Sequence, residues 1–475
     1  MKIPLPIRVL VAIANFGAKN DGYLRQLINE YQSMPFDVDI VVLSNLHKDL
    51  GSEVELVAVD LQGRDPWTLP FAHKEILASR LNDYDLFIYS EDDTLITERN
   101  LRAYLELSAA LREDEILGFM RFEEGRGGEF HFPDVHGCFH WDAKSVRSRG
   151  NHKFAFFTNE HSACYVLTQE QLRRAIDSGG FLVGPHCDGL YLLPETAATD
   201  PYTQCGFTKL ICISRFEDFL VHHLPNRYVE VGLGVSGREL RRQLDTLLRI
   251  SNNGRNPQSL CETQTKLKSA SYSKFYYEPV RPELVTSVAP EVKTLLSVGC
   301  EWGAMEAVLA EKGLSVVAVP LDPVIPGGAE AAGVEMVFGD LRTAREQLNG
   351  RSFDCILFSN IIHLVPDPAA ILSLFQGLLA DKGRTILLVP KVVPFLVYWR
   401  RIRREGFFGD FAGYESTGVH PTSRRTIRRW FRKAGMETES ITEVRSPQAR
   451  AVDGFMCSLT NNVLFSEFLA VARRA

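Results

Sequence analysis

An alternation of short apolar runs with amphipathic helical patterns constrains the fold of this chain more than any other feature, and it occurs twice. Between residues 7 and 118, the apolar runs RVLVAIAN, VDIVVLSN and DLFIYS are separated by the helical patterns DGYLRQLINEYQSM and HKEILASRLN. A second series begins with TLLSVGC and ends with TILLVP, between residues 294 and 390. Because strands separated by helices predict parallel sheets, we expect an α/β fold in both halves.

The length of the chain and one polar stretch predict its division into domains. At roughly 100 to 200 residues per domain, the 475 residues predict two or three domains. Residues 251–259 read SNNGRNPQS, a turn-rich stretch with little to bury. We therefore expect a first domain over residues 1–230, a linker with connecting helices over 231–275, and a second domain over 276–475.

Charge and cysteine content exclude several classes of protein. Acidic residues outnumber basic ones 59 to 53, so the chain as a whole is unsuited to binding nucleic acid. The nine cysteines are an odd number without a CxxC pair, which favours a reducing compartment. Prolines interrupt the N-terminal apolar run, and a lysine and two prolines interrupt the stretch from Thr385 to Trp399. We expect neither a signal segment nor a membrane span, and therefore a cytoplasmic protein.

Three consecutive carboxylates, Glu91, Asp92 and Asp93, follow the apolar run DLFIYS. Their mutual repulsion is costly unless a cation or hydrogen-bond donors lie nearby. Because side chains alternate along an extended segment, Glu91 and Asp93 point to the same side. Oxygen ligands in this arrangement suit Mg²⁺ or Mn²⁺ bridging a diphosphate. A solvated acidic turn has the same sequence, so both interpretations stay open at this point.

Residues 5–230 resemble the GT-A fold of nucleotide-sugar glycosyltransferases, whose DxD motif closes a strand and is represented here by Glu91-x-Asp93. The resemblance implies that Asp93 holds the metal and that Glu91 contacts the nucleotide ribose or a metal-bound water. A late histidine often joins the same metal, and LVHHLPNRY offers His222 or His223, of which we favour His223. The other contacts to donor or acceptor that the resemblance implies are Asn15, Gly17, Ser44, Lys74, Asp92 and His161.

An inverting glycosyltransferase also needs a carboxylate base within hydrogen-bond reach of the acceptor hydroxyl. The segment HCDGLYLLPETAATDPY supplies two candidates, of which Glu195 is favoured over Asp188. The implied partners are a nucleotide-sugar donor and a glycan or lipid-linked glycan acceptor. A second interpretation treats residues 1–230 as a carbohydrate-binding or scaffolding module without catalysis.

A glycine-containing turn opens the second series. The sequence TLLSVGCEWGAMEAVLAEKG combines an apolar strand, a turn with Gly299 and Gly303, and a helix that starts near Ala304. Such a turn allows a ligand to approach the backbone beside a helix N-terminus. A dinucleotide site is disfavoured because G-x-G-x-x-G is absent. Polar residues follow the later strands of the series, at Asp322, Asp340, Ser359 and Asn360.

Residues 276–446 resemble class I S-adenosylmethionine-dependent methyltransferases, on the glycine turn and on the succession of strand-end residues. The resemblance implies that Gly299, Cys300 and Gly303 line the methionine part of the cofactor and that Asp340 meets the adenine amino group. The remaining implied cofactor contacts are Asp322, Ser359 and Asn360. Methyl transfer is an in-line displacement that depends mainly on positioning. His363 is the candidate to take a hydroxyl proton, although a role in the pocket wall is equally compatible with its place.

Two residues depart from the methyltransferase pattern. Glu301 stands where VGCGxG sequences carry their middle glycine, so a side chain enters a crowded turn. The ribose-binding acid normally ends the second strand, but Pro320 stands there and Asp322 follows two residues later. The second domain is therefore expected either to bind S-adenosylmethionine or to be an inactive module that serves as a partner surface.

Arginine and tryptophan concentrate near the C-terminus, in YWRRIRR at 398–404 and SRRTIRRWFRK at 423–433. Such a face suits anionic lipid headgroups or a diphosphate-linked acceptor, and so a peripheral membrane contact, and a solvated helix face explains it as well. No recognised nucleic-acid-binding module accompanies it.

The sequence as a whole indicates a bifunctional transferase. Metal-assisted glycosyl transfer would be followed by S-adenosylmethionine-dependent O-methylation of the same growing glycan or a related acceptor, in a polysaccharide, a glycolipid or a protein glycan. The alternative is a methyltransferase with a non-catalytic, carbohydrate-binding N-terminal module.

Overall fold

The computed structural model describes residues 7–187, 189–252, 254, 256–267, 270–392, 413–446 and 466–475. The chain divides into two compact units, Met1–Ser251 (unit 1) and Asn252–Ala475 (unit 2). The expected linker over 231–275 is therefore shared between the units. Its first part forms helix α7 (Gly237–Ser251), whose apolar face, including Leu240, Leu247 and Ile250, is buried. Its second part belongs to unit 2.

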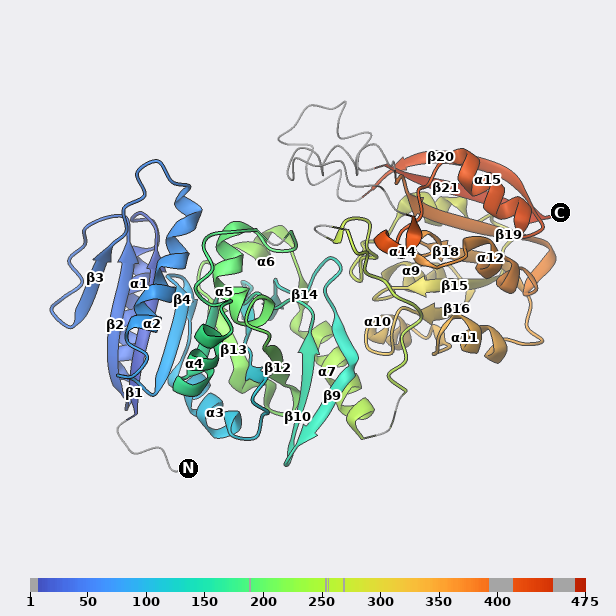
Figure 1. Ribbon diagram of the computed structural model, residues 1–475. Coiled ribbons are helices and arrows are strands. Elements are labelled where there is room, and N and C mark those ends of the chain that lie inside the picture. Colours follow the sequence, from blue (N-terminus) through green and yellow to red (C-terminus); the bar gives the residue numbers. More distant parts are fainter. Residues whose placement is uncertain are drawn as a thin grey trace. The chain divides into compact units, whose positions relative to one another are not determined.

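Unit 1 contains a five-stranded sheet with the order β11-β4-β1-β2-β3 (Figure 1). Strands β1 to β4 are parallel and β11 runs antiparallel to β4. Every residue of β1 after Arg8 is buried, as expected for a strand covered on both faces. The strands are β1 (Arg8–Asn15), β2 (Asp37–Ser44), β3 (Val54–Ala58), β4 (Leu86–Glu91) and β11 (Cys164–Thr168).

The helices of unit 1 follow from apolar spacing and capping residues. Helix α1 (Asp21–Ser33) buries Leu24, Leu27, Ile28 and Tyr31, which share one helical face. Helix α4 (Gln169–Asp177) begins with a capping box between Thr168 and Gln171. The other helices are η1 (Pro66–Phe71), α2 (Ala72–Ser79), α3 (Glu98–Ser108), α5 (Leu193–Thr203), η2 (Ile213–Phe219) and α6 (Arg227–Val231).

Two further sheets complete unit 1, a four-stranded one with the order β6-β12-β10-β9 and a five-stranded one with the order β14-β8-β7-β13-β5. Their strands are β5 (Thr94–Leu95), β6 (Glu115–Leu117), β7 (Met120–Glu124), β8 (Phe130–Phe132), β9 (Trp141–Arg149), β10 (His152–Phe157), β12 (Thr208–Cys212), β13 (Leu220–His223) and β14 (Val235–Ser236). Strand β5 starts at Thr94, directly after the last of the three acids, and it pairs with β13 so that His223 lies opposite Thr94. This pairing brings a histidine from late in the unit to the acidic turn.

Unit 2 is built on one seven-stranded sheet with the order β17-β16-β15-β18-β19-β21-β20 (Figure 1). The first five strands are parallel, and β21 is antiparallel to both of its neighbours. The chain order changes direction between β15 and β18, and in open α/β sheets ligands bind at the carboxyl ends of strands next to such a point. The strands are β15 (Thr294–Cys300), β16 (Ser315–Pro320), β17 (Glu335–Met336), β18 (Phe353–Ser359), β19 (Leu379–Pro390), β20 (Met436–Arg445) and β21 (Ser466–Arg474).

Helices flank the sheet of unit 2, and two of them begin at aspartates whose side chains cap them. Asp340 caps α11 and Asp367 caps α12 by accepting hydrogen bonds from backbone N–H groups of the first turn. The helices are α8 (Pro282–Ser287), α9 (Ala304–Glu311), α10 (Gly327–Ala331), α11 (Leu341–Gln347), η4 (Ile362–Leu364), α12 (Pro368–Gln376), α14 (Tyr414–Thr417) and α15 (Arg424–Lys433).

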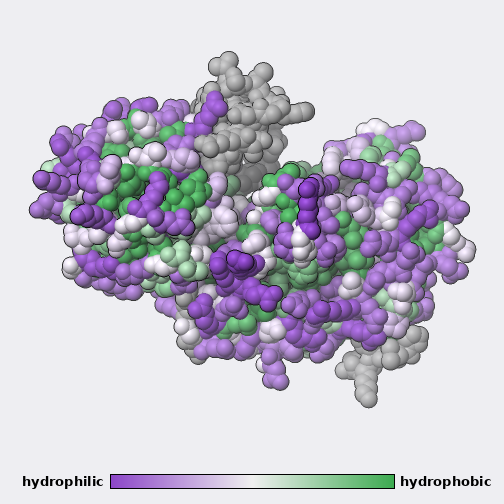
Figure 2. All heavy atoms as spheres, turned by 180° about the vertical axis from the view of Figure 1, so that it is seen from behind, coloured by the Kyte–Doolittle hydropathy of each residue, from purple (hydrophilic) through white to green (hydrophobic). Residues whose placement is uncertain are grey.

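The surface drawn in Figure 2 is mostly hydrophilic, with smaller apolar areas between the polar side chains. Within the residues that the structure describes, no helix has both the length and the apolar character needed to cross a bilayer. Of the two basic segments noted in the sequence, 398–404 lies outside the described residues. The other forms α15, which buries Ile427, Trp430 and Phe431.

Candidate functional site

The acidic turn of unit 1 is held by side chains from the ends of neighbouring strands. Asp92 is buried and accepts hydrogen bonds from the amides of Asn15 (2.6 Å) and Asn20 (2.7 Å). Asn15 in turn accepts a hydrogen bond from Ser44 Oγ at 3.1 Å. Asn15 and Ser44 end the adjacent parallel strands β1 and β2, which explains why they meet at this edge. These two residues, expected to contact the donor, thus support Asp92.

Asp93 lies beside His223, as the resemblance implied. The distance from Asp93 Oδ2 to His223 Nε2 is 3.6 Å. His223 Nδ1 is 2.5 Å from Glu123 Oε1, and Glu123 Oε2 accepts a hydrogen bond from the Val229 N–H at 2.6 Å. Glu123 therefore fixes the orientation of the imidazole. The second carboxylate oxygen of Asp93, Oδ1, is buried and has no hydrogen-bond partner among the described residues.

His222, the other candidate for the metal, points away from Asp93. Its ring stacks on Phe122 with centroids 4.7 Å apart, and its Nε2 lies 3.0 Å from Asn226 Oδ1. The two histidines are consecutive on β13, and consecutive strand residues point to opposite faces. The structure therefore places only His223 of this pair at the acidic turn.

The three acids at the turn differ in their pKa values. Burial, together with repulsion from Asp93, raises the pKa of Glu91 to about 8. Burial also raises the pKa of Asp92 to about 6, and the hydrogen bonds from Asn20 and Asn15 limit that rise. For Asp93 burial acts in the same direction, but the hydrogen bond and charge of His223 outweigh it and lower the pKa. Asp93 thus has the lowest pKa of the three acids and stays ionised to the lowest pH.

The expected divalent cation has only part of a site here. Within the described ranges, no group of three or more His, Cys, Asp and Glu side chains is placed to hold a metal ion. Asp93 and His223 supply two groups of suitable chemistry, and the unpartnered Asp93 Oδ1 is an oxygen that suits a hard cation. The residues fit a cation whose other ligands come from a bound molecule.

Lys74 and Gly17, which were expected to contact the nucleotide-sugar donor, are instead bonded to other residues of the protein. Lys74 is buried and forms an ion pair with Asp200, a residue far along the chain that the sequence pattern did not connect with it. The backbone N–H of Gly17 donates to Asn45 Oδ1 at 2.8 Å, and its φ of 68° explains the glycine.

Glu195 interacts electrostatically with Glu91 of the acidic turn, and His161 interacts with His223 beside that turn. Burial, with the charge of Arg121, lowers the pKa of His161 to about 3, so this imidazole is neutral. Glu195 accepts a hydrogen bond from the Leu192 N–H at 2.7 Å at the start of α5, and its charge contributes to the raised pKa of Glu91. Asp188, the second candidate base, lies outside the described residues.

The glycine turn of unit 2 requires its glycines. Gly299 has φ 89° and Gly303 has φ 86°. A side chain at Gly303 would collide with Ala329 of α10, and one at Gly299 would press on Ile361. Cys300 is buried between them, and its Sγ donates to the carbonyl oxygen of Glu301 at 3.3 Å. The turn is therefore closely packed at the carboxyl end of β15.

Glu301, the residue that departs from the methyltransferase pattern, has a buried partner. It forms an ion pair with Lys274, whose side chain is fully buried and whose Nζ is 3.9 Å from Glu278 Oε1. Burial raises the pKa of Glu301, and Lys274 limits the rise. Burial acts to lower the pKa of Lys274, but Glu301 and Glu278 outweigh it and raise that pKa. The lysine that compensates Glu301 was not identified from the sequence.

The acids that follow β16 and β17 accept backbone hydrogen bonds. Asp322 Oδ1 accepts from Val324 N–H (2.7 Å) and Ile325 N–H (2.9 Å). Asp340 Oδ1 accepts from the first turn of α11, and Asp340 Oδ2 accepts from the Gln258 amide at 2.7 Å. Both carboxylates lie at the edge that carries the glycine turn, because parallel strands end together there.

Strand β18 ends at Ser359, which is buried, and the loop after it begins with Asn360, whose φ is 48°. The Asn360 amide donates to Glu467 Oε1 at 2.9 Å and to Glu278 Oε1 at 3.3 Å, while Asn360 Oδ1 has no partner among the described residues. His363 is buried with Nε2 3.0 Å from the Tyr272 carbonyl oxygen, and burial lowers its pKa to about 3. The structure thus places His363 inside the protein, and both its role as a base and its role in the pocket wall stay predictions.

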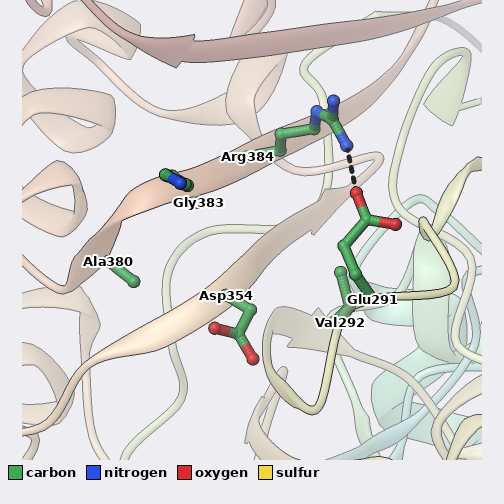
Figure 3. Close-up of a pocket in the computed structure, with 7 residues that line it drawn as sticks. Glu291, Val292, Asp354, Ala380, Gly383 and Arg384 are labelled. Atoms are coloured by element: carbon green, nitrogen blue, oxygen red, sulfur yellow. Dashed lines mark hydrogen bonds and ion pairs between the residues drawn. The ribbon is translucent and has the colours of Figure 1, made fainter.

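A small cavity of about 110 Å³ lies at the opposite, amino edge of this sheet (Figure 3). Glu291, Asp354 and Arg384 line it, and a 3.1 Å ion pair joins Glu291 to Arg384. None of the residues implicated by the sequence lines it.

Residues 272–441 match a family described as "Methyltransferase domain". No curated protein matches the sequence. Among solved structures, the chain is similar to mitomycin 7-O-methyltransferase, with 14% identity and a TM-score of 0.27 over 39% of this chain and 49% of that one. It therefore spans about half the length of that enzyme.

Two other similar structures are matched over more of their own length. A methyltransferase from Methanosarcina mazei has 17% identity and a TM-score of 0.30, over 41% of this chain and 98% of that one. Magnesium protoporphyrin IX methyltransferase from Synechocystis, solved with S-adenosylhomocysteine, has 15% identity and a TM-score of 0.30, over 40% and 78%. The family match lies within unit 2, and it identifies residues 272–441 as a class I methyltransferase domain, the class that takes its methyl group from S-adenosylmethionine.

Proposed function

We propose that unit 2 binds S-adenosylmethionine at the carboxyl edge of its sheet and methylates an oxygen of a glycan or a related acceptor. The observation that carries the proposal is the gathering of Asp322, Asp340 and the Gly299–Gly303 turn at that one edge. Asp340 would meet the adenine amino group, Asp322 the ribose, and the turn the methionine part.

The charge of this edge also suits the cofactor, which carries a cationic sulfonium. Two buried cations, Lys274 and Arg281, lie among more numerous buried carboxylates, and Glu306 Oε2 has no partner among the described residues. The carboxylates are Glu278, Glu301, Glu306 and Glu467. A buried excess of negative charge is costly alone and is relieved by a bound cation. The bound cofactor supplies the methyl group, and these residues bind and orient it.

Calorimetric titration of the full chain with S-adenosylmethionine tests the proposal. Asp340→Ser keeps a residue able to cap α11 but removes the carboxylate, so we expect binding about tenfold weaker or worse. Asp381→Ser, at an exposed position of β19, is the matched control and should bind as the parent does. Equal affinity of the parent and Asp340→Ser would contradict the assignment of the adenine contact.

We also propose a second activity, glycosyl transfer by unit 1 from a nucleotide sugar with a divalent cation. The specific observation in its favour is the unpartnered Asp93 Oδ1 beside His223, at the end of a parallel strand. The cation would bind Asp93 and His223 and take further oxygens from the diphosphate. Phe16 and Leu46, which are 53% and 42% exposed, follow β1 and β2 at the same edge and offer an apolar surface for the nucleobase. Glu195 is the proposed acceptor base.

Manganese-dependent hydrolysis of nucleotide sugars by the purified full chain tests this second proposal. Asp93→Asn and His223→Ala should each reduce the hydrolysis about 100-fold or more, because each removes a cation ligand. His222→Ala is the matched control, since His222 faces the other side of β13. Donor binding without hydrolysis would favour the carbohydrate-binding module, and equal losses at both histidines would contradict the ligand assignment. If the full chain has both activities, the presence of the two units in one chain favours successive reactions on the same glycan.

A further inference from the structure

A segment of unit 2 that precedes β15 runs across the carboxyl edge of the sheet. We call its described residues, 256–267 and 270–278, the strap. It folds back on itself: the Lys274 N–H donates to the Thr263 carbonyl oxygen at 2.9 Å, and the Thr265 N–H to Ser273 Oγ at 2.8 Å. The strap therefore lies on the edge as a paired structure rather than as a single passing chain.

The first part of the strap contacts the end of β16 and the start of α11. The Gln258 amide donates to Asp340 Oδ2 at 2.7 Å. The Leu260 N–H donates to the Leu321 carbonyl oxygen at 2.8 Å, and the Leu260 carbonyl oxygen accepts from the Leu341 N–H at 3.3 Å. The Leu260 side chain is 1% exposed and packs in the same core cluster as Leu321 and Leu341. The groups that follow the two strands are thus satisfied by the chain itself.

This pattern of donors and acceptors corresponds to the edge of an adenine ring. Adenine presents an amino group that donates hydrogen bonds and neighbouring ring nitrogens that accept them. At Asp340 and Leu341, the Gln258 amide supplies the donor and the Leu260 carbonyl oxygen supplies the acceptor. The apolar side chain of Leu260 fills the space beside them, as a flat apolar ring would.

The later part of the strap is held differently. The Trp302 N–H donates to the Tyr276 carbonyl oxygen (3.1 Å), and the Trp302 indole N–H to the Glu278 carbonyl oxygen (2.7 Å). Lys274 is anchored by Glu301. These anchors include a buried ion pair and a buried aromatic ring, Tyr276. By contrast, Leu260 is the one buried residue between positions 256 and 262. The first part can therefore separate from the sheet edge more easily than the later part.

We propose that residues 256–262 of the strap occupy the adenine subsite, and that S-adenosylmethionine binds only when these residues leave it. This inference rests on the proposed function of unit 2. The docked strap competes with the cofactor, so the apparent affinity is the intrinsic affinity reduced by the fraction of molecules in which the strap is released. Anything that weakens the docking of Leu260 increases that fraction.

The test uses the full chain and the substitution Leu260→Asp, which places a charge at the buried anchor. We expect this variant to bind S-adenosylmethionine about tenfold tighter than the parent, because a buried leucine side chain no longer holds the strap in place. Gln264→Asp adds the same charge at an exposed strap position and is the matched control, with affinity within about twofold of the parent.

Hydrogen exchange provides a second measurement on the unmodified chain. With saturating S-adenosylmethionine, the peptide covering 256–264 should exchange faster, while the region of Leu341 stays protected. Binding by the parent with 256–264 still protected, or weaker binding by Leu260→Asp, overturns the strap inference and leaves the proposed methyltransferase site in place. If neither the parent nor Leu260→Asp binds the cofactor, the proposed function of unit 2 fails, and the strap is not a gate.

Discussion

The two units collect carboxylates at the same place, the carboxyl edge of a parallel sheet, but they satisfy them in different ways. In unit 1, Asp92 is bound by the neutral amides of Asn15 and Asn20, and one oxygen of Asp93 has no partner among the described residues. In unit 2, Glu301 is paired with a buried lysine and Asp340 with the Gln258 amide. At the first edge, an oxygen of Asp93 is left without a partner among the described residues, whereas at the second edge the segment before β15 supplies partners for Glu301 and Asp340.

The difference follows from how the acids are distributed along the chain. The acids of unit 1 are consecutive, so they repel one another within one turn, and the raised pKa values of Glu91 and Asp92 reflect that crowding and their burial. In unit 2, Glu301 and Asp340 stand in separate loops, and each meets a different strap residue, Lys274 and Gln258. Removing single groups from either edge tests whether this contrast is real.

The largest expected effect is at the buried ion pair of unit 2. Lys274→Met leaves Glu301 buried without its cation, which should lower the free energy of unfolding of unit 2 by about 3 kcal/mol. Hydrogen exchange followed by mass spectrometry reads the two units separately in the full chain. The double variant Lys274→Met, Glu301→Gln should recover most of the loss, and peptides of unit 1 should not change. A single variant as stable as the parent would remove the contrast between the edges.

The next effect concerns pH and the acidic turn of unit 1. The pKa of Glu91 is about 8 in the folded protein and ordinarily 4.5, so its contribution to stability is present at low pH and is lost as pH rises through 8. Glutamine resembles the protonated acid at every pH. Discounted for the partial exposure of the residue, Glu91→Gln should stabilise unit 1 by about 2 kcal/mol at pH 9 and have no such effect at pH 4.

Pulse proteolysis in urea, with peptides of unit 1 identified by mass spectrometry, measures this pH dependence. Glu53→Gln, at an exposed position, is the control and should show no dependence of this kind. Equal stability of Glu91→Gln and the parent at pH 9 would mean that the acidic turn carries no uncompensated charge.

A smaller effect is expected for the hydrogen bonds that support Asp92. Ser44→Ala removes the hydroxyl that donates to Asn15 and should destabilise unit 1 by about 1 kcal/mol, because a buried acceptor loses its partner. Urea unfolding compared with that of Ser52→Ala, at an exposed position, measures the difference. A loss no larger than the control's would show that the amide of Asn15 is held by other groups.

The smallest effect is expected at the amino edge of unit 2, where charges face solvent. Arg384 pairs with Glu291 and Glu439, and its side chain is 38% exposed (Figure 3). Arg384→Ala should change the stability of unit 2 by about 0.5 kcal/mol or less, as is usual for surface ion pairs. A loss comparable to that of Lys274→Met would mean that charge pairing, rather than burial, governs stability at both edges.

Periodicity predicted the parallel strands of both units, because apolar runs and helical spacing are local properties of the chain. The proximity of Asp93 and His223 came from the resemblance to a fold, since the two residues are far apart in sequence. The pairs Lys74–Asp200, Lys274–Glu301 and Gln258–Asp340 were missed. They join distant positions, and no local pattern marks which acid a lysine or an amide will meet.

Glu301 illustrates the same limit. Taken alone, it interrupts a glycine turn and suggests an impaired site. The structure supplies the buried Lys274 that makes a glutamate acceptable there. A departure from a family pattern is therefore informative only together with the residue that compensates it.

The position of the strap determines what a shortened protein would report. A fragment beginning at residue 276, the domain boundary expected from the sequence, would lack Gln258, Leu260 and Lys274. Its adenine subsite would be open without competition, while Glu301 would be left buried without a partner. Such a fragment would bind its cofactor more tightly than the intact chain and would unfold more readily. The choice of starting residue would therefore determine both the measured cofactor affinity and the measured free energy of unfolding.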